Sequence, residues 1–259
     1  MERFVHFTSL DNAFSILERG IVPRSSLNER NIQYLANDSL RLDGLSHVNL
    51  SITHPNIRLF YKFRKNNPDR CYVVFSIKPE VLLEYTGDSD RGRYEFSNTN
   101  AASNNAMRCN VEQLFAGQRP EGYRDEWTTD SQAEVLIPGP IDPRYLDAII
   151  LPSNYGDDDE RLSTIRELDE LISDKGLDCK LEVCDIVFDD LRQRMMNASN
   201  QEKFEYYFLS WQATEKNYIF LESEIEKIPR KSHFGSIAVP MDWLPRYTEY
   251  YGDPSNRIG

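Results

Sequence analysis

The spacing of apolar and polar residues predicts several short β-strands in the first 150 positions. Val48–Ile52 alternates apolar and polar residues, as a half-buried strand does. Residues 4–7 and Tyr72–Ile77 are runs of apolar, aromatic and β-branched residues, and Tyr72–Ile77 is the strongest strand signal in the chain. Residues 133–137 and Leu146–Leu151 are also rich in apolar residues. Together these segments predict a sheet.

Helical patterns lie in the intervals between these strands. Ala13–Arg19 is amphipathic and follows several N-cap candidates, and Gly20 is placed to end the helix because glycine readily adopts the left-handed conformation. Residues 56–65 form a second helical pattern, with Pro55 at the expected first helical position. Further helices are predicted at residues 79–83, 111–115, 161–172, 186–195 and 201–211.

The order of these elements favours the α+β class. Short strands and short helices are mixed without regular strand–helix–strand alternation. Residues 24–44 are polar and carry turn signals instead of a helical pattern. Because the pattern turns mostly helical beyond about residue 185, we expect one domain over residues 1–184. Residues 185–259 then form a C-terminal extension that packs on the same domain.

Composition narrows the class of protein. The chain has 259 residues, of which 40% are hydrophobic, as is ordinary for a globular protein. No stretch approaches the roughly 18 apolar residues that span a bilayer. Residues 1–6 lack the apolar core and cleavage site of a signal peptide. We therefore expect a cytoplasmic protein.

The cysteines and histidines give no sign of a metal site. No pair of cysteines has CxxC spacing, and the four histidines form no ligand pattern with them. We therefore expect no metal, and reduced, mostly buried thiols. The cysteines are Cys71, Cys109, Cys179 and Cys184.

The formal net charge of −12 argues against a broad surface that coats nucleic acid. It leaves room for a local basic groove, because several cations gather in one short segment. They either contact nucleic-acid phosphates or form a solvated helix face, and the sequence leaves both interpretations open. These cations are Arg58, Lys62, Arg64, Lys65 and Arg70.

Three patches of the sequence carry candidate chemistry. Residues 5–20 contain a His-x-Thr motif followed by Asn, Ile-Leu and Gly. Residues 37–52 form the second patch. The third is Trp127 with the Gln-Ala-Glu-Val-Leu strand at residues 132–136. Taken together and in this order, the patches resemble the DarT family of DNA ADP-ribosyltransferases, whose opening strand and helix are similar to residues 5–20. The resemblance covers roughly residues 1–152.

The resemblance implies a fold and an activity. The fold is that of an ADP-ribosyltransferase, with split mixed β-sheets flanked by short helices and here a mostly helical C-terminal extension. NAD⁺ is the co-substrate, and ADP-ribose is attached to thymidine or guanosine in single-stranded DNA. Such proteins act as toxins in toxin–antitoxin or phage-defence systems, beside an antitoxin, often a macrodomain hydrolase, that removes the modification. No GxGxxG or P-loop pattern supports a different nucleotide fold.

The resemblance also assigns roles to residues. Glu134 is the catalytic carboxylate at the start of its strand, where it orients the nicotinamide ribose and takes a proton from the attacking base. Arg41 shares the catalytic role and contacts the cofactor's pyrophosphate through its planar guanidinium. The other cofactor contacts are His6, Thr8, Asn12, Gly20 and Ser51. The DNA contacts are Tyr123, Arg124, Trp127, Thr128 and Gln132.

Several of these residues have structural alternatives. Asn12 is equally suited to capping the following helix, and His6 to a satisfied structural role. Trp127 is either a base-stacking residue or a core anchor. For the whole chain, the rival functions are an ADP-ribosyltransferase acting on RNA or protein, and a non-catalytic interaction module that keeps the fold.

Overall fold

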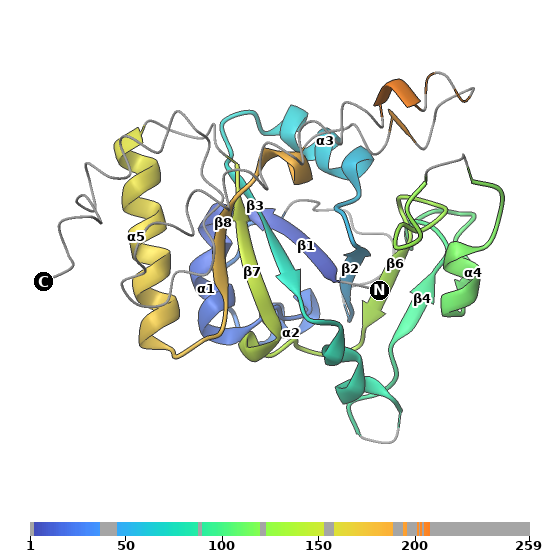
Figure 1. Ribbon diagram of the computed structural model, residues 1–259. Helices are drawn as coiled ribbons and strands as arrows, with labels where there is room; N and C mark the ends of the chain where they lie inside the picture. Colours follow the sequence, from blue (N-terminus) through green and yellow to red (C-terminus); the bar gives the residue numbers. More distant parts are fainter. Residues whose placement is uncertain are drawn as a thin grey trace, which may run out of the picture.

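The computed structural model describes residues 3–36, 46–87, 90–119, 123–152 and 158–188, with residues 194–195, 201, 203 and 205–207. Its centre is a mixed eight-stranded sheet in the order β5-β4-β6-β2-β1-β3-β7-β8 (Figure 1). Only β7 and β8 are parallel neighbours. The strands are β1 (Phe4–Ser9), β2 (Val48–Ile52), β3 (Tyr72–Ile77), β4 (Glu95–Ser97), β5 (Arg108–Cys109), β6 (Glu134–Ile137), β7 (Leu146–Leu151) and β8 (Lys180–Val183).

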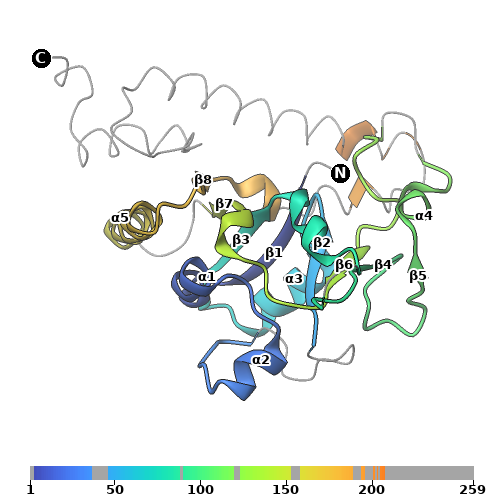
Figure 2. The same cartoon turned by 90° about the horizontal axis from the view of Figure 1, so that it is seen from below.

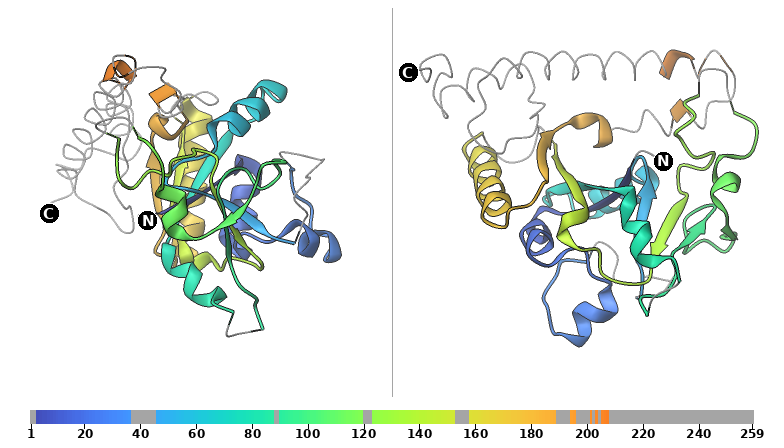
Figure 3. Two further views of the ribbon diagram at one scale, coloured as in Figure 1. Left: turned by 90° about the vertical axis from the view of Figure 1, so that its right-hand side faces the viewer. Right: turned by 60° about the horizontal axis from the view of Figure 1, so that its bottom comes forward.

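The described helices are short, apart from α5 (Asp158–Asp174), which has 17 residues and lies at the edge of the sheet. α1 and α5 pack on the same face, and the hairpin of β4 and β5 lies with α4 at the opposite edge from α5 (Figure 3). α2 projects beyond α1, away from the sheet (Figure 2). The helices are α1 (Ala13–Arg19), α2 (Arg24–Glu29), α3 (Ile57–Asn66), α4 (Val111–Phe115) and α5 (Asp158–Asp174), with 3-10 turns at Leu10–Asn12, Pro79–Tyr85, Pro143–Tyr145 and Asp185–Phe188.

The two faces of the sheet bury different sets of side chains. Because neighbouring residues of a strand point to opposite faces, Phe4 packs in the cluster under α1 and α5, whereas Val5 packs in a second cluster on the other face. The second cluster contains Trp127, and Phe7 packs beside it against the apolar side of α3. The sheet is therefore covered on both faces.

The structure confirms the α+β class and the strands that the pattern predicted. It also confirms Gly20 as the end of α1, with a φ of +81°. The prediction that Pro55 is the first helical residue is wrong, because Asn56 caps α3 and accepts a hydrogen bond from Leu59 N at 3.2 Å. An asparagine oxygen satisfies a free N–H at the helix start, which proline does not.

Two kinds of element escaped the sequence pattern. α2 lies inside the polar stretch 24–44 and is only six residues long, too short for its periodicity to stand out. β5 and β8 are also short, and β8 lies in an acid-rich region. β8 is a strand because it pairs in parallel with β7, and the sequence of β8 alone does not predict this pairing.

The start of the C-terminal extension packs on the sheet. Val187 and Met195 are buried in the cluster that contains Val5 and Trp127. The helix expected at 186–195 begins in a 3-10 turn, and residues 194–195 are helical. Of the helix expected at 201–211, the described residues are helical and the others lie outside the described part. The domain boundary at residue 184 stays a prediction.

None of the four cysteines forms a disulfide bond; Cys179 is buried and the other three are half-buried, so the expected burial is complete only for Cys179. Burial raises the pKa of the Cys71 and Cys179 thiols to about 12, so both are protonated at neutral pH. Within the described residues, no helix combines the length and hydropathy needed to span a bilayer.

Candidate active site

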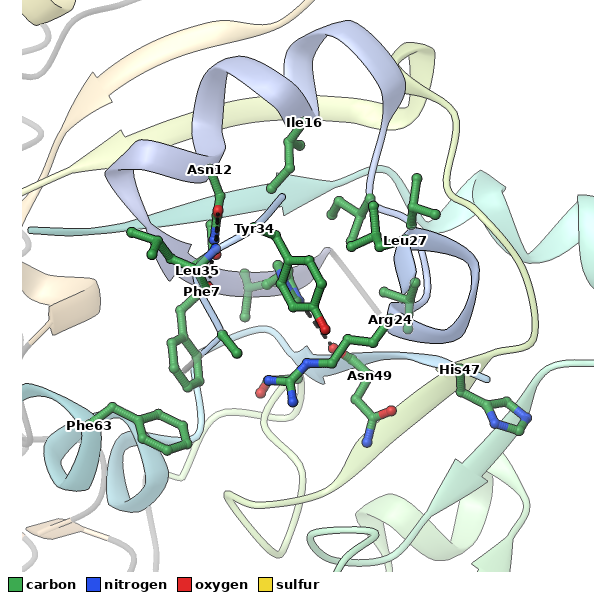
Figure 4. Close-up of a pocket in the computed structure, with 18 of the residues that line it drawn as sticks. Phe7, Asn12, Ile16, Arg24, Leu27, Tyr34, Leu35, His47, Asn49 and Phe63 are labelled. Atoms are coloured by element: carbon green, nitrogen blue, oxygen red, sulfur yellow. Dashed lines mark hydrogen bonds between the residues drawn. The ribbon is translucent and has the colours of Figure 1, made fainter. Parts of the chain in front are cut away.

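The site begins where β1 and β2 part. β1 pairs with β3 along its whole length, from Phe4 to Ser9, but with β2 only at Phe4 and Val5. Beyond Val5 a cavity of about 610 Å³ opens between the two strands (Figure 4). This volume lies within the roughly 300–1,000 Å³ typical of small-molecule sites. The split that the resemblance implied is therefore a divergence of two strands inside one continuous sheet.

The cavity has walls of different chemistry. α1, α2 and residues 32–36 supply one wall, with apolar side chains such as Ile16 and Leu27, while β2, α3 and β6 supply the other. Arg24 and Lys62 bring positive charge from α2 and α3. Among the described lining residues Glu134 is the only carboxylate. The arrangement suits an anionic ligand with apolar rings, bound beside one acidic group.

Glu134 is the first residue of β6, as the sequence predicted. Glu134 is 5% exposed, and its carboxylate accepts hydrogen bonds from three donors among the described residues. Ala101 N donates at 2.9 Å, Asn100 Nδ2 at 3.1 Å and Asn49 Nδ2 at 3.2 Å. The donors come from β2 and from the loop after β4, so both neighbouring strands of β6 fix the orientation of the carboxylate.

His6, Thr8 and Asn12 lie together at the cavity. His6 Nδ1 is 3.3 Å from Asn49 O, and Asn12 Nδ2 donates to Thr8 Oγ1 at 2.9 Å. Asn12 makes no capping bond to α1, so the capping alternative is wrong. Its amide instead bonds both backbone groups of Leu35, donating to the carbonyl and accepting from the N–H, each at 2.9 Å.

Gly20 and Ser51 also line the cavity, and the structure gives each a local reason. A Cβ on Gly20 would lie 1.9 Å from Ile141 O, so only glycine permits this approach of the two backbones. Ser51 is buried, and its Oγ accepts from Asn56 N at 3.1 Å. The structure thus brings every described candidate for cofactor contact into one cavity with Glu134. Arg41 lies outside the described residues, and its role stays a prediction.

The loop before β6, at residues 123–132, was expected to contact DNA, but its tryptophan is buried in the core. Trp127 is 1% exposed and packs with Val5 and Val74 on the second face of the sheet. Trp127 is therefore a core residue. Its ring is enclosed and cannot stack on a DNA base in this structure. Thr128 is also 1% exposed, and its Oγ1 donates to Asp130 O at 2.7 Å, so it shapes the loop.

The remaining candidates for DNA contact lie around Trp127. The Tyr123 ring stands edge-on to Trp127 at 5.3 Å, and the Arg124 guanidinium lies 5.4 Å over its face. Both residues and Gln132 are half-buried. None of them lines the cavity. Their role in DNA binding stays a prediction.

Sequence reasoning missed many of the residues that line the cavity, among them Asn49, Tyr34 and Arg24. Asn49 had a usable signal, since it lies two positions before Ser51 and must face the same side of the strand. Tyr34 and Arg24 had none, because they belong to the stretch that appeared irregular. Within the predicted basic segment, Lys62 is the member that lines the cavity, whereas Arg64 lies 5.5 Å over the Phe60 ring.

Fold and site together define an α+β protein of the ADP-ribosyltransferase type, in which two parting strands hold a cavity with one buried carboxylate. Over residues 5–171 the chain matches the family described as ssDNA thymidine ADP-ribosyltransferase, DarT. The chain belongs to this family, which confirms the resemblance in its sequence. It is thus a member of a family of DNA-modifying enzymes.

One solved structure supports the fold. The Thermosipho africanus DarTG in complex with ADP-ribose is 18% identical, with a TM-score of 0.51 over 73% of this chain. This chain spans only 51% of that one. The Thermus sp. 2.9 DarT, seen with carba-NAD⁺ and with ADP-ribosylated ssDNA, is 13% and 12% identical, with TM-scores of 0.41 and 0.37. Each match covers 65% of this chain, and 90% and 89% of the other. No curated protein matches the chain.

Proposed function

We propose that this protein transfers ADP-ribose from NAD⁺ to thymidine in single-stranded DNA, with Glu134 as the catalytic carboxylate. The observation that carries the proposal is the position of Glu134, the only carboxylate among the described residues that line the cavity between β1 and β2. The family description supplies the acceptor base. Guanosine is the alternative base.

The proposed reaction breaks one glycosidic bond and forms another. The bond between the nicotinamide nitrogen and the ribose C1′ breaks, and nicotinamide leaves as a neutral molecule that keeps the bonding electron pair. A ring nitrogen of the base then bonds to C1′ and loses its proton to Glu134. The ribose passes through an oxocarbenium-like state, which the negative charge of a nearby carboxylate stabilises.

The residues around Glu134 have distinct proposed roles. Asn49 and Asn100 hold the carboxylate in one orientation, because each donates to it. His6, Thr8 and Ser51 contact the ribose or amide groups of NAD⁺. The cofactor's diphosphate needs cations, for which we propose Arg41, because a guanidinium pairs with phosphate oxygens in a bidentate way.

For the DNA strand, we propose contacts with Arg124, Tyr123 and Gln132. Arg124 supplies the charge that a phosphate requires, and its loop runs directly into β6 and Glu134. Trp127 supports these contacts by fixing the loop from inside the core. The cations on α3 offer a second surface for the phosphate backbone.

We also propose a biological setting. The protein acts in the cytoplasm as the toxin of a toxin–antitoxin or phage-defence system, and its partner is an antitoxin of the macrodomain-hydrolase kind. The resemblance to the family supports this setting, and the similar Thermosipho africanus protein is named DarTG. Co-expression with such a hydrolase relieves growth inhibition if the setting is correct.

The test is to incubate the purified protein with NAD⁺ and, in separate reactions, single-stranded DNA, duplex DNA, RNA and protein. Mass spectrometry of each acceptor is expected to show an added ADP-ribose only on single-stranded DNA that contains thymidine. An adduct on RNA or protein alone would keep the chemistry and replace the acceptor. A protein that neither binds NAD⁺ nor forms any adduct would be a non-catalytic module, and the proposal would be wrong.

A further inference from the structure

One wall of the cavity is made by a segment that has no regular secondary structure. Residues 32–36 follow α2, and each of them lines the cavity. Figure 4 shows the Tyr34 ring projecting into the cavity, between α1 and β2. Its hydroxyl donates to Asn28 Oδ1 at 3.1 Å, so the ring is held at its outer end. The ring face is then left to contact whatever fills the cavity.

Asn12 fastens this segment to α1. Its Nδ2 carries two hydrogens, and both are used, one by Thr8 Oγ1 and one by Leu35 O. Its Oδ1 accepts from Leu35 N. A single side chain thus ties both backbone groups of the residue next to Tyr34. The amide has no donor left for a ligand, and the contacts that it makes instead hold the segment that carries Tyr34.

We propose that Tyr34 is a stacking platform for a planar ring of the dinucleotide, and that Asn12 is a positioning residue that sets this platform. The inference rests on the proposed function. An aromatic face in an apolar cavity stabilises a heteroaromatic ring by stacking and by removing its faces from water. Ile16 and Leu27 supply apolar neighbours. The adenine and nicotinamide rings of NAD⁺ share this chemistry, and the experiment separates them.

The first test measures the affinity of the full-length protein for ADP-ribose, AMP and nicotinamide mononucleotide by calorimetry. Tyr34→Ala is expected to raise Kd about tenfold, within the range that stacking on one aromatic side chain provides. Tyr34→Phe keeps the ring and is expected to stay within about twofold of the wild type, since only the hydroxyl contact is lost. Tyr61→Ala is the matched control, since Tyr61 is 66% exposed on α3. Melting temperatures verify that each variant folds.

The ligand whose Kd rises in Tyr34→Ala identifies the ring that stacks on Tyr34. Loss for ADP-ribose and AMP assigns Tyr34 to adenine, and loss for nicotinamide mononucleotide alone assigns it to nicotinamide. If the folded Tyr34→Ala variant has unchanged Kd values, the stacking role of Tyr34 is wrong. The proposed function still stands in that case, provided that the wild type transfers ADP-ribose. A wild type that binds none of the three ligands and transfers nothing would overturn both.

The second test isolates the role of Asn12. Asn12→Ala alone is expected to raise Kd and KM for NAD⁺ about tenfold with kcat nearly unchanged, because Asn12 does not touch the reacting atoms. In the Tyr34→Ala background the same change is expected to add less than about twofold, since residues that act through one contact are not additive. Fully additive losses would show that Asn12 acts independently of Tyr34, and would overturn the positioning role.

Discussion

Two loops flank the strands β4 and β6, and they contact different parts of the protein. The loop at residues 98–107, between β4 and β5, is rich in asparagine and reaches Glu134. The loop at residues 123–132, just before β6, carries Tyr123, Arg124 and Trp127 and reaches the second core cluster. The second loop thus buries its tryptophan in the core, whereas the asparagine-rich loop contacts the carboxylate.

Burial energetics explain the difference. Burial of the large apolar ring of a tryptophan is favourable, whereas burial of an unpaired asparagine amide costs free energy, so the tryptophan packs on a nearby apolar face. A buried carboxylate needs donors, and asparagine supplies both a side-chain donor and a tight turn. In the first loop Asn100 does both, since its Nδ2 donates to Glu134 and its Oδ1 accepts from Ala102 N at 3.0 Å.

The largest expected effect is at Glu134, which the first loop holds. Glu134→Gln is expected to lower kcat by a factor of about 10² to 10⁴, the range for removal of a general base. Single-turnover transfer to a thymidine oligonucleotide measures it. Glu134→Ala is expected to lose activity equally but to melt at a lower temperature, because Ala101 N and the half-buried amides of Asn49 and Asn100 lose this acceptor. Wild-type kcat in Glu134→Gln would refute the catalytic assignment.

The second effect tests the second loop. Trp127→Ala is expected to cost about 3–5 kcal/mol in the free energy of unfolding, because it empties a fully buried indole site. Urea denaturation measures this loss. Arg124→Ala is the control from the same loop. An unchanged stability together with lost DNA binding would mean that the indole contacts DNA after all, and that the comparison of the two loops is wrong.

A smaller effect is expected at Asn100. Asn100→Ala removes one of the three described donors to Glu134, and we expect kcat to fall about tenfold, which corresponds to one modest hydrogen bond. Asn104→Ala is the matched control, because Asn104 is exposed in the same loop. Equal activity of both variants would show that the Asn100 side chain does not orient the carboxylate.

The smallest effect on stability is expected at Arg124. Arg124→Ala is expected to cost less than about 1 kcal/mol, since its contact with the Trp127 ring is partly exposed and its ion pair with Glu126 is 3.7 Å long. If Arg124 contacts a phosphate, KM for DNA rises and the salt dependence of KM becomes shallower, while KM for NAD⁺ stays constant. Steady-state kinetics at two salt concentrations separate these results.

The pattern of apolar and polar residues predicted secondary structure that depends on neighbouring residues. The five strands β1, β2, β3, β6 and β7 and the helix α1 follow from the hydrophobic pattern, and the end of α1 follows from Gly20. The cavity candidates His6, Thr8 and Ser51 came from a family resemblance, and the structure brings them together. The role of Asn12 was not foreseen, because its partner Leu35 is 23 positions away in a stretch without a recognisable pattern.

The sequence by itself determined the class of fold, a strand at residues 133–137 that contains Glu134, and the family to which the chain belongs. Tertiary structure alone decided that β1 and β2 part beyond Val5, that Trp127 is buried, and that Asn49 reaches Glu134 across 85 positions. The physical reason is that periodicity and turn propensity are properties of neighbouring residues. Burial and the pairing of buried polar groups depend on which distant segments meet.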